Sequence, residues 1–230
     1  MNGFSRGAIS PLLSVWRPLV ALTGALLLTA CSSNPLPPFT ASGYVADGGV
    51  VRIWRKDNGD GSVHMLTAFS PYGNGATTTN EYRWQGDNLV FIEQNIQGEL
   101  PEHSKVRFDD RGELSFMQRE VDGQKQQLSR EQIALYQYQA SRTKVTSEAL
   151  RIGKVILRQG RWHRDGTVTT CEGATFSPKL DNPSQSHIAR RQSHSSLEVS
   201  IAWLEAPEGS QLLLVANENF CSWQPEPGEF

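Results

Sequence analysis

Residues 106–116 read Val-Arg-Phe-Asp-Asp-Arg-Gly-Glu-Leu-Ser-Phe, and this stretch contains the pattern that decides the fold. Apolar residues two positions apart, such as Val106 and Phe108, lie on one face of a β-strand. Residues 109–112 supply Asp and Gly, which favour a tight turn. Because a strand that returns after so short a turn pairs with the strand before it, the stretch predicts an antiparallel hairpin.

The same alternation recurs from residue 43 to residue 128. Turn residues separate the apolar pairs at 57–61, 86–88 and 122–123. No segment before residue 129 is suited to a crossover helix, so the expected sheet is antiparallel throughout. The pairs expected to share one strand face are Val51/Ile53, Tyr82/Trp84, Leu89/Phe91, Val106/Phe108 and Leu114/Phe116.

A long helix is expected over residues 129–153. Ser129 and Gln132 match a capping box, and Gly153 is suited to the C-terminal end of a helix. Two apolar faces are expected after Ser129. The last residue of the first face and the first residue of the second are five positions apart rather than three or four, which predicts an irregularity near residues 141–144. The two faces consist of Ile133, Tyr136 and Ala140, and of Val145, Ala149 and Ile152.

Residues 154–230 return to strand patterns, with about five strands expected. The clearest alternation is Leu197, Val199, Ile201 and Trp203, whereas residues 177–195 are polar and typical of a loop. This spacing favours a small barrel, with the oligonucleotide/oligosaccharide-binding type as one candidate. The predicted fold class is mainly β (α+β): an antiparallel β meander with one long helix and a C-terminal small β-barrel-like unit.

Residues 1–30 have the composition of an export signal, with basic residues, no acid and an apolar run at 19–28. Cys31 follows Leu-Thr-Ala, which resembles a bacterial lipobox. The resemblance implies cleavage before Cys31, diacylglycerol on its sulfur and an acylated amino group. Ser32 stands where an inner-membrane retention signal usually has Asp, so the resemblance favours the periplasmic face of the outer membrane. Residues 31–42 then form the lipidated cysteine and a proline-rich tether.

Loss of residues 1–30 removes two basic residues and no acid, which changes the net charge from −2 to −4. This mildly acidic balance gives no support for nucleic-acid binding. With Cys31 lipidated, Cys171 and Cys221 remain, and an oxidising periplasm favours a disulfide between them. Free thiols or metal ligands are the alternatives. The separation of 50 positions excludes a Cys-x-x-Cys redox centre.

No catalytic motif is evident, and no cofactor is expected. The chain has no Gly-x-Ser-x-Gly elbow, and sequence neighbours such as His194 and Ser195 rarely form a catalytic triad. Three histidines of the C-terminal unit, His163, His187 and His194, are candidate zinc or copper ligands, although their spacing matches no metal motif. Histidines on a surface loop are the alternative. Trp162 and His163, directly before a turn, are the candidate surface contact.

Several segments together resemble a known family. Besides the lipobox they are Pro-Pro-Phe-Thr-Ala-Ser-Gly (37–43), Val-Arg-Ile-Trp-Arg-Lys (51–56), Tyr-Arg-Trp-Gln-Gly-Asp-Asn-Leu (82–89), Leu-Ser-Phe-Met-Gln-Arg-Glu-Val (114–121), Cys-Glu-Gly (171–173) and Trp-Leu-Glu-Ala-Pro-Glu-Gly (203–209). Over nearly its whole length the chain resembles the YjaH-like family of gammaproteobacterial lipoproteins of unknown function. The resemblance implies a location and no catalytic residues.

A weaker similarity links the C-terminal third to the small barrel of NlpE-type lipoproteins. It rests on residues 160–162, Cys171 and Phe176. The chain lacks the Cys-x-x-Cys of that type's other domain, so this similarity does not extend to redox or copper sensing.

These patterns predict a non-enzymatic, lipid-anchored periplasmic protein that binds an unknown envelope protein or component. The alternative is a binding module for a small amphiphile, glycan or metal. The expected divisions are a signal (1–30), a tether (31–42), a β unit (43–128), a helix (129–153) and a C-terminal β unit (154–230).

Overall fold

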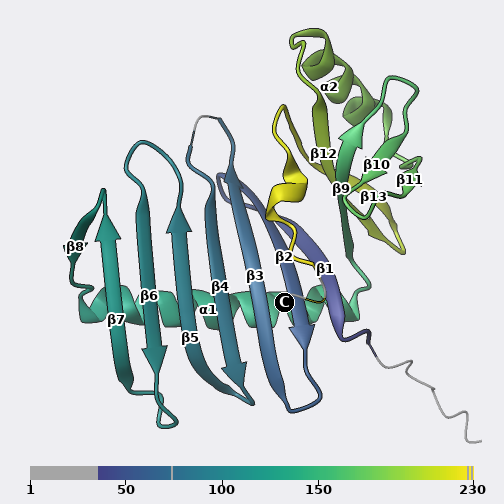
Figure 1. Ribbon diagram of the computed structural model, residues 1–230. Coiled ribbons are helices and arrows are strands. Elements are labelled where there is room, and N and C mark those ends of the chain that lie inside the picture. Colours follow the sequence, from purple (N-terminus) through teal and green to yellow (C-terminus); the bar gives the residue numbers. More distant parts are fainter. Residues whose placement is uncertain (1–35, 74, 227, 229) are drawn as a thin grey trace, which may run out of the picture. The chain divides into compact units, whose positions relative to one another are not determined.

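Eight consecutive strands form an antiparallel meander in which each strand pairs with the next (Figure 1). The computed structural model describes residues 36–73, 75–226, 228 and 230. The meander confirms the antiparallel pairing expected from the alternation and the turns. Its strands are β1 (Phe39–Ala46), β2 (Gly49–Asp57), β3 (Ser62–Pro71), β4 (Thr78–Gln85), β5 (Asn88–Ile96), β6 (Glu102–Phe108), β7 (Leu114–Val121) and β8 (Gln124–Gln126).

The strand β1 begins at Phe39, inside the segment 31–42 that the sequence analysis assigned to a tether. Residues 39–42 pair with residues 53–56 of β2, so their backbone groups belong to the sheet. The expected export signal and Cys31 lie outside the described residues. Within the described part of the chain, no helix is both long enough and apolar enough to cross a membrane.

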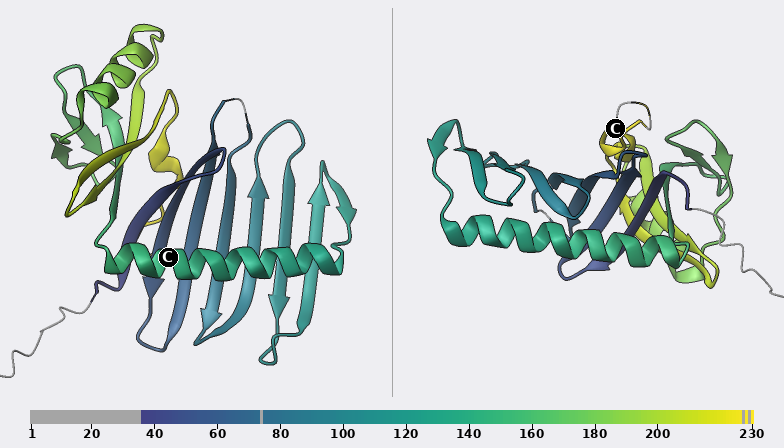
Figure 2. Two further views of the ribbon diagram at one scale, coloured as in Figure 1. Left: turned by 180° about the vertical axis from the view of Figure 1, so that it is seen from behind. Right: turned by 90° about the horizontal axis from the view of Figure 1, so that it is seen from below.

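One long helix, α1 (Arg130–Ile152), crosses one face of the meander (Figure 2). The Ser129 hydroxyl accepts from the Gln132 backbone and the Gln132 side chain accepts from the Ser129 backbone, so the predicted capping box is confirmed. A hydrophobic cluster fills the interface between α1 and the sheet. Its buried members are Ile53, Val63, Met65, Tyr82, Trp84, Ile92, Val106, Phe108, Leu128 and Ala140.

The expected irregularity near residues 141–144 is wrong, because α1 runs without a break through this stretch. In a continuous helix, the residues that follow Ala140 on the sheet side include Ser147 and Arg151, which are both buried. The second apolar face was therefore also wrong. Val145 is 65% exposed and Ile152 is 67% exposed on the outer side of the helix.

The C-terminal residues form a second antiparallel sheet of five strands in the order β11-β10-β9-β12-β13. The expected barrel is wrong, because no pairing between the edge strands β11 and β13 is seen in the described residues. The number of strands agrees with the expectation. The strands are β9 (Ile156–Trp162), β10 (Val168–Thr170), β11 (Thr175–Phe176), β12 (Val199–Ala206) and β13 (Gly209–Ala216).

The segment 177–195, expected to be a loop, contains the helix α2 (Asn182–Ser193). Asp181 caps it by accepting from the backbone of Ser184, and Pro183 suits its first turn. Ile188 is fully buried against the second sheet, so one apolar residue suffices to dock a helix that is otherwise polar. The helix covers a sheet face, and no strand among the described residues closes a barrel there.

The second sheet packs against the meander on the face opposite α1. The shared core joins residues of β2 and β3 to residues of β9, β12, β13 and the short helix η1 (Phe220–Trp223). It includes Trp54, Ala68, Leu157, Leu204 and Phe220. This contact covers the β1–β3 part of the face and makes residues 36–230 one compact unit.

Gly160 in β9 lies tightly against the backbone of β10. A Cβ atom there would lie 2.2 Å from the Thr169 carbonyl oxygen in β10. We expect Gly160→Ala to lower the free energy of unfolding by about 1–3 kcal/mol, since backbone must move. Urea denaturation measures this change. Gly59→Ala is the matched control, because its Cβ meets no atom within 4 Å; an equal loss at both positions contradicts the prediction.

Candidate functional site

The two cysteines of the C-terminal unit form the expected disulfide. Cys171 and Cys221 have Cα atoms 5.2 Å apart and are joined through their sulfurs. The bond links the end of β10 to η1. The alternatives of free thiols and cysteine metal ligands are therefore wrong for this pair.

The three candidate metal-binding histidines have separate surroundings. His163 Nε2 lies 2.7 Å from Thr169 Oγ1, and His194 Nδ1 lies 2.7 Å from the Arg190 carbonyl oxygen. His187 lines a depression beside α2 and β13. Among the residues placed by the structure, no group of three His, Cys, Asp or Glu side chains could hold a metal ion.

Trp162, the candidate surface contact, is half-buried and packs against the core between the second sheet and α2. Together with Arg164 and Gln185 it lines a depression of about 430 Å³. His163, its neighbour, is engaged with Thr169. Trp162 thus both packs against the core and lines this depression.

The sequence analysis missed the uncovered part of the meander. The face opposite α1 is covered by the second sheet over β1–β3 and carries polar and aromatic side chains over β4–β7. We call this region the open face. It comprises Thr79, Glu81, Arg83, Phe91, Glu93, Asn95, His103, Lys105, Arg107, Phe116, Gln118 and Glu120.

Strand pairing arranges the open face in three rows that run across the strands. Directly paired residues of neighbouring strands have side chains within contact distance on the same face. The rows are Thr79, Asn95, His103 and Glu120; then Glu81, Glu93, Lys105 and Gln118; then Arg83, Phe91, Arg107 and Phe116.

The third row, which we call the cation–aromatic row, alternates positive charge and aromatic rings. The Arg83 guanidinium carbon lies 5.1 Å from the Phe91 ring centre. The guanidinium carbon of Arg107 lies 6.0 Å from the Phe91 ring centre and 5.7 Å from that of Phe116. These separations are within the range of cation–π attraction. Phe116 is 42% exposed, so part of its ring is available to another molecule.

Two β-bulges direct both aromatic side chains onto this face. In β5 the pairing shifts between Arg83 and Trp84, so Leu89 packs in the core while Phe91 points outward. In β7 a second shift puts Phe116 opposite Arg107. The expectation that Leu89/Phe91 and Leu114/Phe116 each share one face is therefore wrong. Bulges re-aim side chains and occur often at functional sites.

The middle row is a network of ion pairs. Glu81 accepts from His64 at 2.8 Å and from Arg83 at 2.7 Å, and Glu93 lies 2.7 Å from His103 and 3.3 Å from Lys105. Burial alone would raise the pKa of the Glu81 carboxyl, but the His64 hydrogen bond and the Arg83 charge hold it below its usual value. A carboxylate stabilised in this way stays charged and is poorly suited to act as a general acid.

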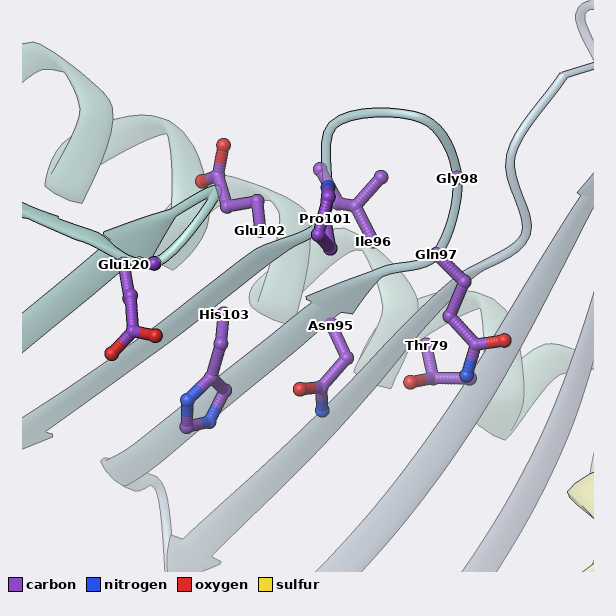
Figure 3. A pocket seen from close by; sticks show the side chains of 10 residues that line it. Thr79, Asn95, Ile96, Gln97, Gly98, Pro101, Glu102, His103 and Glu120 are labelled. Carbon is purple, nitrogen blue, oxygen red and sulfur yellow. The ribbon is translucent and has the colours of Figure 1, made fainter.

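The first row borders an open depression of about 440 Å³ (Figure 3). The side chains of Thr79, Asn95, His103 and Glu120 follow one another across four strands. They offer hydroxyl, amide, imidazole and carboxylate groups, all of which form hydrogen bonds with polar ligands.

Comparisons with known proteins identify the family. A family model described as "Protein of unknown function (DUF1481)" matches residues 41–226. The chain belongs to this family. The DUF1481 chain is also 62% identical to "Uncharacterized protein YjaH" of Escherichia coli (strain K12), over 232 residues and 100% of both chains. No solved structure matches the chain.

These matches support the resemblance to a YjaH-like family of unknown function, whereas the lipoprotein nature and the similarity to NlpE-type lipoproteins stay predictions. The matched proteins supply no site residues. The open face presents partly exposed aromatic rings, ion-paired charges and hydrogen-bonding groups on one sheet. The signal that could have identified this face is the set of polar residues that alternate with the buried residues in each strand. His103, Lys105 and Arg107 alternate with buried Ser104 and Val106 in β6.

Proposed function

We propose that this chain is a non-enzymatic, lipid-anchored envelope protein that binds a protein or another envelope component through its open face. The observation that carries the proposal is the pair of bulges that turn Phe91 and Phe116 outward beside Arg107. Phe116 is partly exposed in the free protein, and aromatic side chains together with Arg are enriched in binding interfaces. A rigid sheet also presents them with little conformational entropy to lose.

The sequence before the folded unit supports the envelope location. Cys31 follows a lipobox-like Leu-Thr-Ala, and residues 1–30 match an export signal. Residues 32–38 would join a lipid on Cys31 to the start of β1. The Cys171–Cys221 disulfide is consistent with an oxidising compartment.

Photo-crosslinking in living cells tests the proposal. A benzophenone-bearing phenylalanine analogue at position 116 should give a discrete adduct, because this side chain faces the ligand. The same analogue at Tyr138, which is 62% exposed on the outer side of α1, is the matched control. Intact mass of the membrane-extracted protein should show an acylated chain that begins at Cys31.

The two readouts separate the two parts of the proposal. Equal adducts from positions 116 and 138, or none from 116, reject the open face as the binding site. A chain without lipid mass rejects the anchor, whatever the crosslinking shows.

A further inference from the structure

The cation–aromatic row has the spacing of an extended binding site. Phe91 in β5 and Phe116 in β7 are separated by the intervening strand β6, which places their backbones about 10 Å apart. Arg107 of β6 lies between the two rings. Phe116 is exposed and Phe91 is partly buried. Two aromatic rings at this distance, with a cation between them, suit a chain of ring-shaped units better than a single small molecule.

Arg107 is the cation most available to a ligand. Arg83 is paired with Glu81 and Lys105 with Glu93, but in the ion pairs of the described residues Arg107 has no carboxylate partner. The whole residue is exposed. A guanidinium group can hold a carboxylate or phosphate with two parallel hydrogen bonds, so this position is suited to an acidic group on the ligand.

The neighbouring row adds groups that match hydroxyls. In the middle row, Glu93 of β5 pairs with Lys105 of β6, and Lys105 pairs with Gln118 of β7. Each of these residues lies two positions along its strand from a member of the cation–aromatic row. Carboxylates accept hydrogen bonds from hydroxyls, and an amide both donates and accepts. The phosphate groups of a nucleic-acid backbone offer no hydrogen-bond donor to the Glu93 carboxylate, whereas the hydroxyls of a sugar do.

We propose that the open face binds an acidic saccharide. The apolar C–H faces of the sugar rings pack on Phe91 and Phe116, the acidic group binds Arg107, and the hydroxyls bond to Glu93 and Gln118. This inference rests on the proposed function, since it names the ligand class of the same face. An acidic saccharide can use the aromatic, the cationic and the hydroxyl-binding groups of the face. A purely anionic ligand would use only the cation, and a purely apolar ligand would use only the rings.

Nuclear magnetic resonance titration of residues 36–230, the compact unit that holds all three hydrophobic cores, tests the inference. The probes are tetragalacturonic acid and maltotetraose, two saccharides of equal length of which only the first is acidic. We expect amide shifts confined to β4–β7 with the acidic probe. Arg107→Gln should weaken this binding about tenfold, as expected for loss of a charge-assisted hydrogen bond.

Matched variants and further probes make each outcome decisive. Arg164→Gln, the same change on an exposed turn, should leave binding unchanged. Phe116→Ser should weaken binding, since it removes a ring on which the sugar packs, whereas Tyr138→Ser on the outer side of α1 should not. Equal binding of maltotetraose, of inorganic phosphate alone or of a single-stranded oligodeoxynucleotide overturns the acidic-saccharide class. Failure of tetragalacturonic acid to bind overturns it too. If the position-116 crosslink persists in that case, the proposed function stands and only the ligand class fails.

Discussion

Replacement of Cys171 or Cys221 by serine should lower the free energy of unfolding by about 4 kcal/mol. The disulfide closes a loop of 50 residues, and its loss frees that loop in the unfolded chain. It also releases η1, whose Phe220 is fully buried between the two sheets. Guanidinium denaturation of the oxidised wild type and of each single variant measures the change.

The double variant Cys171→Ser/Cys221→Ser distinguishes a shared bond from two separate contributions. Since either substitution removes the same cross-link, the double variant should be no less stable than the less stable single variant. Reduced wild type should match the double variant. Clearly additive losses would show that each thiol contributes independently and would contradict the prediction.

The meander was predictable because its signals are local. Each turn carries Gly or Asp where the backbone requires it; Gly112, for example, adopts a φ of 77° in the β6–β7 turn. The capping box at Ser129 likewise depends on residues three apart. Local sequence preferences of this kind predict the structure correctly here because the tertiary packing favours the same conformation.

The predictions that failed concern features that are set by a neighbouring strand or by the layer packed on the opposite face. A bulge adds one residue to one strand, so Phe91 changes face without any change in the apolar spacing Leu89/Phe91. In β12 the alternation of Val199, Ile201 and Trp203 suggested one buried face. Ala202 and Leu204 are buried as well, because the meander covers the other side of that strand.

The open face could not be assembled from the sequence for the same reason. Arg83, Phe91, Arg107 and Phe116 come from four strands, and only the pairing register brings them into one row. That register depends on two bulges. Polar residues at alternate positions indicate the uncovered face of each strand, but they do not show which residues of different strands share a row.

Arg52→Ala should be a strongly destabilising single substitution, at a cost of about 3 kcal/mol or more. Arg52 is fully buried between the two sheets. Its guanidinium donates to Gln159 Oε1 at 3.1 Å and to Ser70 Oγ at 3.0 Å. It also lies 4.9 Å from the Phe220 ring centre. Truncation therefore opens a cavity and leaves the buried Gln159 oxygen without this donor.

Burial lowers the pKa of Arg52 to about 10, with the charge of Glu218 opposing the shift. The side chain is thus still charged at neutral pH, and the fold bears the cost of desolvating that charge. Arg52→Met keeps most of the volume and removes this cost, so it should lose less than half as much stability as Arg52→Ala. Urea denaturation of both variants, with Arg164→Met on an exposed turn as the control, makes the comparison.

The ranking of the two variants decides what Arg52 contributes. If Met and Ala cost the same, the hydrogen bonds to Gln159 and Ser70 dominate and volume contributes little. If Arg52→Ala costs less than about 1 kcal/mol, the site relaxes and the prediction is wrong. A methionine variant that is as stable as the wild type would mean that the charge contributes no net stability. The polar link between β2 and β9 would then serve to fix how the two sheets pack, a role that other buried polar groups are known to have.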